Sequence, residues 1–321
     1  MAHSGSIGFN WEQTLGTVIG AGLTIVIFSI YAWWKIRHKA VRNERPPLQT
    51  KILRPAGYSL SRRIDNLSES FNLALIESII AGMFFGFLSV GLYPFFEDLV
   101  LQRFTFAQVR TQPGFYYIYS LLFLMLSAIA WMVAAILKLI QRITEMRNCR
   151  LGMRGEQVVA EELANPVLLA AGYITFHDIP GDGAWNIDHV VIGPSGIYVL
   201  ETKTRARRKP TRKQQDQDVL FDGKVLQFPW CYDSKAAKQV ERNAEWVKKF
   251  VTNFAPQDIP VQPIIVLPGW YAKSQGNYPV KAMPVDYLVK GCLLADKRRF
   301  TMEQLKPLIR RFDERCRDLE F

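Results

Sequence analysis

The stretch NIDHVVIGPSGIYVLETK, residues 186–203, decides the fold of the C-terminal half of this 321-residue chain. Two runs of strand-forming apolar residues, IDHVVI and IYVLE, flank the turn-rich GPSG, a pattern that predicts a β-hairpin. If GPSG is a four-residue loop, Ile192 pairs with Ile197. Each further pair lies one residue earlier on the first strand and one residue later on the second. Both faces of this hairpin are apolar, which predicts a central strand pair covered on both sides.

The open end of the predicted hairpin carries charges where Val or Ile would pack better. The register sets Asp188 opposite Glu201 and Asn186 opposite Lys203, so the two acids and the lysine share one face. Directly opposite residues have Cβ atoms about 4.5–5.5 Å apart, and two carboxylates that close repel each other unless a cation lies between them. Mg²⁺ favours such a pair together with waters and phosphate oxygens. The alternative is a structural ion cluster on a half-exposed sheet face.

The rest of the C-terminal half alternates helix and strand signals, which predicts an α/β fold around a mixed central β-sheet. The T-x-x-Q of the tail is a helix-capping pattern, and Asp222-Gly223 is a strong two-residue turn signal. The expected elements are a helix at 155–164, a strand at 173–177, the hairpin at 186–203, a second hairpin at 219–228, a helix at 233–254, a strand at 261–267 and a helix from 301.

Three long apolar runs precede this half, at residues 15–34, 71–96 and 115–137. Each is long enough to cross a hydrocarbon core of about 30 Å as a helix, and each has Tyr or Trp near an end. Glu77 is the one acid within them. The sequence therefore predicts a membrane region over 1–144, with three transmembrane helices, and a cytosolic domain over 145–321.

The distribution of basic residues predicts the orientation of these spans. Nine Lys or Arg residues lie between the first two runs, whereas only Arg103 and Arg110 lie between the second and third. Because basic loops remain cytoplasmic, the N-terminus is expected outside and everything after residue 137 in the cytosol. The predicted location is the inner (cytoplasmic) membrane, with the lipid bilayer as a partner.

Four segments, in their order along the chain, resemble a known family. RLGMRGEQVVAEEL, NIDHVVIGPSGIYVLETK, the KQVERNAEWVKKF helix and IIVLPGW are similar to the nuclease-related domain, NERD, of the PD-(D/E)XK nuclease superfamily. The resemblance covers residues 150–270 and implies an α/β/α fold in which the D and the E-x-K lie on adjacent strands. Ile187 stands before Asp188 in place of the proline of the superfamily name, as NERD sequences usually show.

The resemblance implies a metal site and a cofactor. Asp188 and Glu201 match the metal-binding acids, and the backbone carbonyl of Thr202 would be a further ligand. The implied cofactor is Mg²⁺ or Mn²⁺. Such an ion lowers the pKa of a bound water and stabilises charge on a phosphate, so the implied reaction is phosphodiester hydrolysis.

The same resemblance assigns three further side chains. Lys203 matches the catalytic lysine, which would orient the attacking water or neutralise developing negative charge. Glu156, at the start of the helix predicted at 155–164, matches the acid that supports the metal site. Gln239 matches the helix glutamine near the site.

A strongly basic stretch, KTRARRKPTRKQQ, follows the hairpin directly. Contact with nucleic-acid phosphates is one use for it, anionic lipid is another, and a solvated basic loop is the structural alternative. We predict nucleic-acid binding because of its position beside the site. No phosphate-binding G-x-x-x-x-G-K-[ST] motif occurs, so no nucleotide cofactor is expected. The predicted nucleic-acid contacts are Arg205, Arg207, Arg208, Lys209, Arg212 and Lys213.

Together these features predict a membrane-anchored, metal-dependent nuclease that hydrolyses DNA, in preference to RNA, at the cytoplasmic face of the membrane. Foreign DNA entering the cell, such as phage or plasmid DNA, would meet an enzyme tethered there. The alternative is a non-catalytic membrane adaptor or sensor whose NERD-like domain binds nucleic acid or a partner. A transporter is disfavoured, because the three runs contain one acid and no paired charges.

Overall fold

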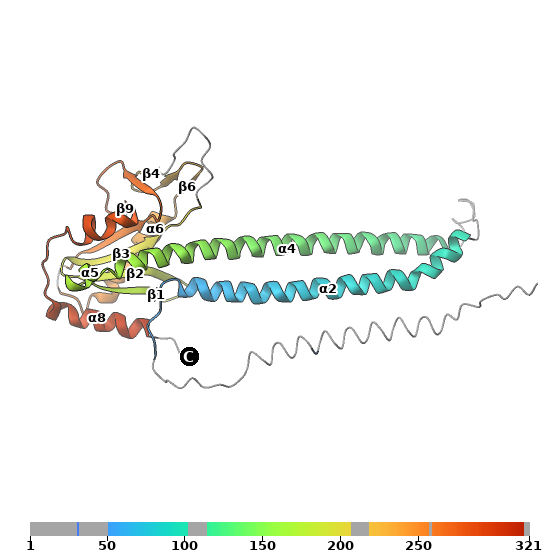
Figure 1. Ribbon diagram of the computed structural model, residues 1–321, viewed down its shortest axis with the longest axis horizontal. Helices are drawn as coiled ribbons and strands as arrows, with labels where there is room; N and C mark the ends of the chain where they lie inside the picture. Colours follow the sequence, from blue (N-terminus) through green and yellow to red (C-terminus); the bar gives the residue numbers. More distant parts are fainter. Residues whose placement is uncertain (1–30, 32–50, 102–113, 207–217, 257–258, 318–321) are drawn as a thin grey trace, which may run out of the picture. The chain divides into compact units, whose positions relative to one another are not determined.

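The computed structural model describes residues 31, 51–101, 114–206, 218–256 and 259–317 (Figure 1). The described residues fall into two units. One lies within Leu67–Thr144, and the other combines Pro46–Asn66 with Glu145–Phe321. Sequence analysis put Pro46–Asn66 in the membrane region. In the structure this segment belongs instead to the C-terminal unit.

Two long helices carry the second and third apolar runs. These helices are α2 (Tyr58–Leu101) and α4 (Gly114–Leu163). Among the described residues, their segments Tyr58–Phe85 and Met125–Leu163 are long and apolar enough to cross a membrane. Large apolar side chains are exposed on both helices, such as Phe84 on α2 and Phe123 on α4. The first predicted span, 15–34, lies outside the described residues except for Tyr31, which is helical.

The helix predicted at 155–164 is the last part of α4. It ends at Leu163 near the predicted position, and Asn165 caps the following short helix α5 (Pro166–Ala170) by accepting from the Val167 N–H at 3.0 Å. Its start is not at residue 155, because the preceding sequence KLIQRITEMRNCRL contains good helix formers and no proline. The helix therefore continues from the third apolar run into the C-terminal unit without a break.

The C-terminal unit is built on a five-stranded mixed sheet in the order β1-β2-β3-β7-β9. The first three strands are antiparallel, and β7 and β9 run parallel to β3. This confirms the predicted α/β class with a mixed sheet. The strands are β1 (Ile174–Pro180), β2 (Asn186–Gly193), β3 (Gly196–Thr202), β7 (Val261–Val266) and β9 (Lys281–Met283).

The central hairpin has the predicted register. Ile192 pairs with Ile197, and the regular ladder continues outward to His189 opposite Leu200. Gly193 and Gly196 also pair, so the loop is two residues long rather than four, and the register is unchanged. The ladder stops before the charged end, so the predicted pairing of Asn186 with Lys203 is not part of it.

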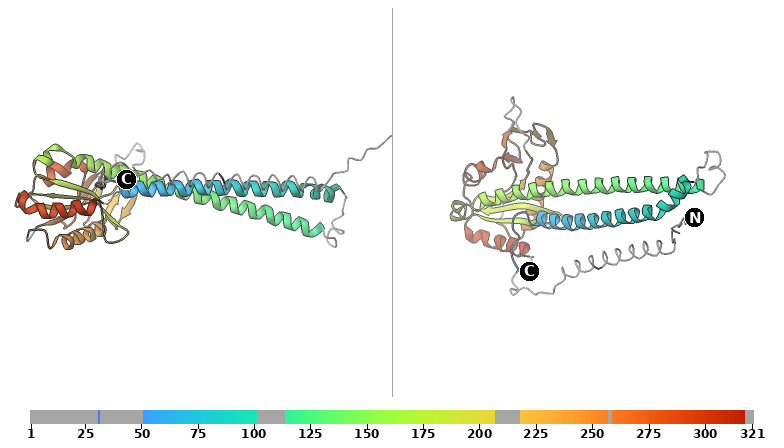
Figure 2. Two further views of the ribbon diagram at one scale, coloured as in Figure 1. Left: turned by 90° about the horizontal axis from the view of Figure 1, so that it is seen from below. Right: turned by 45° about the vertical axis from the view of Figure 1, so that its right-hand side comes forward.

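Helices cover both faces of this sheet, as the apolar pattern of the hairpin predicts. One face packs against α6 (Ala236–Val251) and α8 (Met302–Cys316), and the other against the end of α4. Figure 2 shows the end of α4 with α5 on one side of the strands and α6 on the other. The hairpin residues in the first layer include Val190, Ile192, Ile197 and Val199, and those in the second include Val191, Tyr198 and Leu200.

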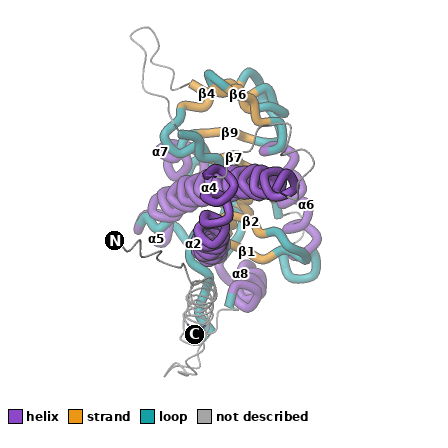
Figure 3. The backbone as a smooth tube through the Cα atoms, turned by 90° about the vertical axis from the view of Figure 1, so that its right-hand side faces the viewer, coloured by secondary structure: helices purple, strands orange, loops and turns teal. Residues whose placement is uncertain are grey.

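A second, four-stranded sheet has the order β6-β5-β4-β8. It contains the predicted second hairpin and adds two strands that the sequence did not indicate. Figure 3 shows β4 and β6 beyond β9, at the edge of the larger sheet. The strands are β4 (Asp218–Phe221), β5 (Leu226–Phe228), β6 (Cys231–Asp233) and β8 (Tyr271–Ser274).

The C-terminal part of the unit is helical. The predicted capping pattern is present in α8, where Thr301 and Gln304 form a reciprocal capping box, and Pro307 lies inside the helix without ending it. Between β9 and α8 the chain forms α7 (Val285–Tyr287) and the short π-helix η1 (Leu288–Leu293). Leu305, Leu308 and Phe312 of α8 complete the first apolar layer.

Two paired histidines give the unit a pH-dependent stability. The Nδ1 atoms of His177 and His189 lie 2.8 Å apart across β1 and β2. Burial lowers the pKa of His177 to about 4, and burial together with His177 lowers that of His189 well below its usual value. Below about pH 6.5 the unfolded chain therefore binds protons that the folded chain does not. The free energy of unfolding consequently decreases as the pH is lowered.

We expect the stability of the parent protein, relative to a His177→Phe variant, to fall by about 1 kcal/mol per pH unit from pH 6.5 towards pH 4.5. The contributions of acids that titrate in both proteins cancel when the two free energies of unfolding are subtracted. Chemical unfolding of the detergent-solubilised proteins at several pH values measures it. A constant difference would show that His177 is not held neutral by the fold.

Candidate active site

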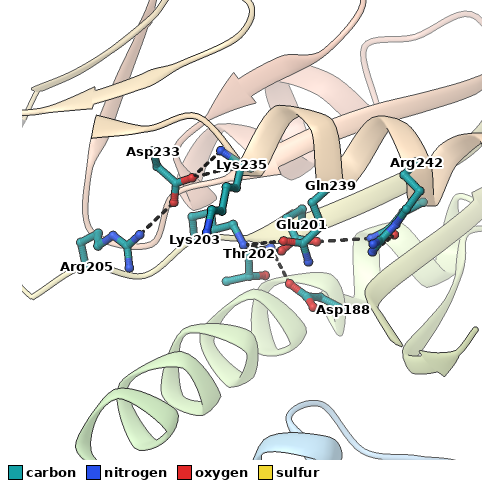
Figure 4. A network of polar contacts seen from close by, with 11 residues as sticks. Asp188, Glu201, Thr202, Lys203, Arg205, Asp233, Lys235, Gln239 and Arg242 are labelled. Atoms are coloured by element: carbon teal, nitrogen blue, oxygen red, sulfur yellow. Dashed lines mark hydrogen bonds and ion pairs between the residues drawn. The ribbon is translucent and has the colours of Figure 1, made fainter. Parts of the chain in front are cut away.

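The ends of β2 and β3 bring the two predicted acids together. Asp188 is 8% exposed and Glu201 is 2% exposed. Figure 4 shows both side chains directed into the same region from neighbouring strands. The Thr202 backbone N–H donates to Asp188 Oδ2 at 2.7 Å, which fixes that carboxylate against β3. The predicted one-face arrangement at the hairpin's open end is present.

Lys203 and α6 complete the inner part of the site. The Lys203 Nζ donates to Glu201 Oε1 at 2.6 Å and to Gln239 Oε1 at 3.0 Å. One turn after Gln239, the buried Asn243 approaches the other oxygen of Glu201, with its Nδ2 3.4 Å from Oε2. The structure therefore brings Lys203 and Gln239 together with Glu201, as the resemblance implies.

Glu156 reaches the same region from α4, which passes close to the end of β3. A Cβ on Gly155 would lie 1.8 Å from Thr204 Oγ1, so the approach requires glycine at this position. Glu156 is buried, and its Oε2 atom has no hydrogen-bond partner among the described residues. An orphaned carboxylate oxygen at the end of two acid-bearing strands points to a missing donor or cation.

Burial raises the pKa of all three acids, and repulsion by neighbouring acids adds to this for Glu156 and Asp188. Burial, followed by Asp178 and Glu201, raises the pKa of Glu156 to about 8. Burial, followed by Glu201 and Glu156, raises that of Asp188 well above its usual value. Burial also raises the pKa of Glu201, against the opposing effect of Lys203. The protein alone therefore supplies too little positive charge to keep these carboxylates ionised together.

The donor set fits a hard divalent cation. Two or three carboxylates without enough compensating charge are the ligands that Mg²⁺ and Mn²⁺ prefer. The described residues contain no cluster of three or more His, Cys, Asp or Glu already arranged around one metal position. A site here would consist of Asp188 and Glu201 completed by backbone or solvent oxygens, with Glu156 at its edge. The carbonyl ligand proposed at Thr202 stays a prediction.

The basic stretch is described only at its start. Arg205 lies in an ion pair with Asp233, Nη2 to Oδ2 at 2.8 Å, so it faces a carboxylate of its own domain. Asp233 also accepts from the backbone N–H groups of Lys235 and Ala236 and so caps the start of α6. The other predicted nucleic-acid contacts, Arg207, Arg208, Lys209, Arg212 and Lys213, lie outside the described residues.

Two polar residues near the site are not among the predicted site residues. Asp178 is fully buried on β1 and raises the pKa of Glu156. Its sequence context, FHDIP, reads as a strand end followed by a turn, and nothing there signals a buried acid. The second is Asn243, whose contact with Glu201 gives it a supporting role. Its helical spacing from Gln239 was the available signal.

The fold and site define an α/β domain with acids and a lysine gathered at the ends of adjacent strands. Residues 151–268 match the family model of NERD, the nuclease-related domain. The chain therefore carries a NERD domain over this range, as the sequence resemblance predicted. No curated protein and no solved structure matches the chain.

The contact between Gly155 and Thr204 predicts a compensating pair of substitutions. We expect Gly155→Ala to destabilise the C-terminal unit by about 1–3 kcal/mol, because the added methyl group meets the Thr204 side chain. Adding Thr204→Ala removes the nearest atom and should recover most of the loss. Thermal unfolding of the single and double variants measures this coupling. Additive effects of the two substitutions would show that the helix and strand are not in close contact here.

Proposed function

We propose that this protein is a membrane-anchored, metal-dependent nuclease whose active site is formed by Asp188, Glu201 and Lys203. The observation that carries the proposal is the gathering of two buried acids and a lysine at the ends of β2 and β3, within a nuclease-related domain. A structural ion cluster would balance its charges internally. Here Asp188 and Glu156 have no ion-pair partner among the described residues.

The proposed chemistry divides between a bound cation and the protein. Mg²⁺ or Mn²⁺, held by Asp188 and Glu201, would activate water and stabilise charge on the phosphate. Lys203 serves as a cationic donor. Two of its contacts, to Glu201 and Gln239, fix its Nζ beside the acids. Among the described residues nothing else accepts from Nζ, so its third proton would serve a phosphate oxygen or the attacking water. A bound cation would oppose the raised pKa of Glu156 and so favour its negative charge at the outer edge of the cation site.

The proposed substrate is DNA in preference to RNA. The net charge of +11 favours a polyanion, and Arg242, exposed one turn from Gln239 on α6, lies over the Trp185 ring at 4.7 Å beside the site. We further propose that the apolar helices anchor the domain in the cytoplasmic membrane with the N-terminus outside. From there it would meet foreign DNA as it enters the cell.

The test is cleavage of linear and circular DNA, and of RNA, by the detergent-solubilised protein with Mg²⁺ and with a chelator. We expect cleavage only with the metal. Asp188→Asn, Glu201→Gln and Lys203→Met should each lower the rate by about 10²-fold or more, because each removes a charge that acts on the reacting phosphate. Matched substitutions at exposed ion pairs, Lys273→Met and Asp313→Asn, should keep the parental rate.

Two outcomes would contradict the proposal in different ways. If the three site variants cleave as fast as the parent, the activity does not reside at these residues. If the parent binds DNA but does not cleave it with any divalent metal, the protein is the adaptor or sensor that the sequence left open.

A further inference from the structure

A short segment outside the NERD match packs against the domain. We name residues 51–59 the inter-span segment, because they lie between the first and second apolar runs. The Arg54 backbone N–H donates to the Cys316 carbonyl at 3.2 Å, at the end of α8. Nearby, Arg317 Nη1 donates to the Lys51 carbonyl at 3.4 Å. These contacts hold the inter-span segment alongside the C-terminal helix, more than 250 residues away in sequence.

The inter-span segment then binds the buried acid that sequence reasoning missed. Asp178 Oδ2 accepts from Arg54 Nη1 at 3.2 Å and from Ser59 Oγ at 2.8 Å. Its Oδ1 accepts from Asn186 Nδ2 at 2.6 Å, on β2 two residues before Asp188. Asp178 also has a φ of 49°, a conformation that surrounding contacts must hold in place. Arg54 thus supplies the charge that lets Asp178 remain buried.

The segment also reaches Glu156. The Gly57 backbone N–H faces the Glu156 carboxylate and lowers its pKa, against the larger effect of burial. Gly57 has a φ of +76°, and a Cβ there would lie 2.8 Å from Met153 Cγ, one turn before Glu156 on α4. Only glycine allows this close approach with this backbone conformation. The segment therefore contacts both acids that border the proposed metal site.

We propose that the inter-span segment is part of the active site, with Arg54, Gly57 and Ser59 as positioning residues for Asp178 and Glu156. The proposal rests on the proposed function, because positioning here means positioning towards a divalent cation. Without Arg54, the buried Asp178 carboxylate loses its ion-pair partner, which is strongly unfavourable. The rearrangement that follows disturbs Asn186 on β2 and the charge beside Glu156. The segment continues directly into α2, so a candidate membrane helix begins at the active site.

The test compares Arg54→Gln, Arg54→Lys and Ser59→Ala with the parent in the full-length protein. We expect Arg54→Gln to weaken Mn²⁺ binding about 10-fold, as loss of an outer partner of a metal site does. Turnover of DNA should fall similarly while KM for DNA is unchanged. Arg54→Lys keeps the charge and should recover part of both losses. Calorimetric titration with Mn²⁺ provides a readout that does not depend on cleavage.

Matched controls lie on the first turns of α2. Ser61→Ala and Arg62→Gln repeat the same chemistry at neighbouring positions that do not contact Asp178, and they should bind Mn²⁺ like the parent. Ser59→Ala removes a single hydrogen bond from a neutral donor to Asp178. Its Mn²⁺ affinity therefore tests the proposal even if Arg54→Gln does not fold.

Each outcome decides a different part of the inference. Parental Mn²⁺ affinity in Arg54→Gln and Ser59→Ala, with only a lower unfolding temperature, would show that the segment is docked but does not position the site, and would overturn the proposal. A parent that binds Mn²⁺ without cleaving nucleic acid would refute the nuclease assignment, while the affinities would still test the segment. A parent that binds no Mn²⁺ would overturn both.

Discussion

The excess of buried negative charge at the ends of β2 and β3 is the constraint on which the rest of the domain depends. Glu156, Asp178, Asp188 and Glu201 are all buried, and among the described residues only Arg54 and Lys203 form ion pairs with them. Isolated charges in such surroundings are strongly disfavoured. Hydrogen bonds from Thr202 and Ser59 satisfy part of Asp188 and Asp178, and Lys203 and Asn243 donate to Glu201. The proposed cation would supply the remaining charge.

The hairpin is suited to this arrangement because its two faces are sealed by different layers. Along most of β2 and β3 there is no room for charge, since α6 and α8 cover one face and α4 the other. Beyond the last ladder pair, His189 with Leu200, the buried acids Asp188 and Glu201 take the place of apolar side chains. Gln239 and Asn243 of α6 contact Lys203 and Glu201 respectively, while Glu156 reaches the same region from α4, so three elements meet at one strand end.

Sequence reasoning found the inner site because its determinants are local. A side-chain period of two and a short turn fix the register of the hairpin, so Asp188 and Glu201 had to share a face once Ile192 paired with Ile197. Gln239 came from the family resemblance. Asp178, Arg54 and Ser59 could not be found this way, because their contacts join residues more than 100 positions apart and no spacing rule connects them. Arg205 and Asp233 are only 28 residues apart, but they lie on different elements and no spacing rule connects them either.

The folded unit is therefore larger than the segment that the family model matches. The match begins at residue 151, yet the C-terminal unit includes Pro46–Asn66 and extends through α8. Breaking a buried ion pair by removing one partner costs about 3–5 kcal/mol, and Arg54 with Asp178 is such a pair, since the acid is fully buried and the arginine side chain is 15% exposed. A domain cut at residue 145 loses that partner along with the N–H that faces Glu156. The segment that leads into α2 and the site beside β2 are thus linked by the same carboxylates, which gives a physical reason for one chain to contain both.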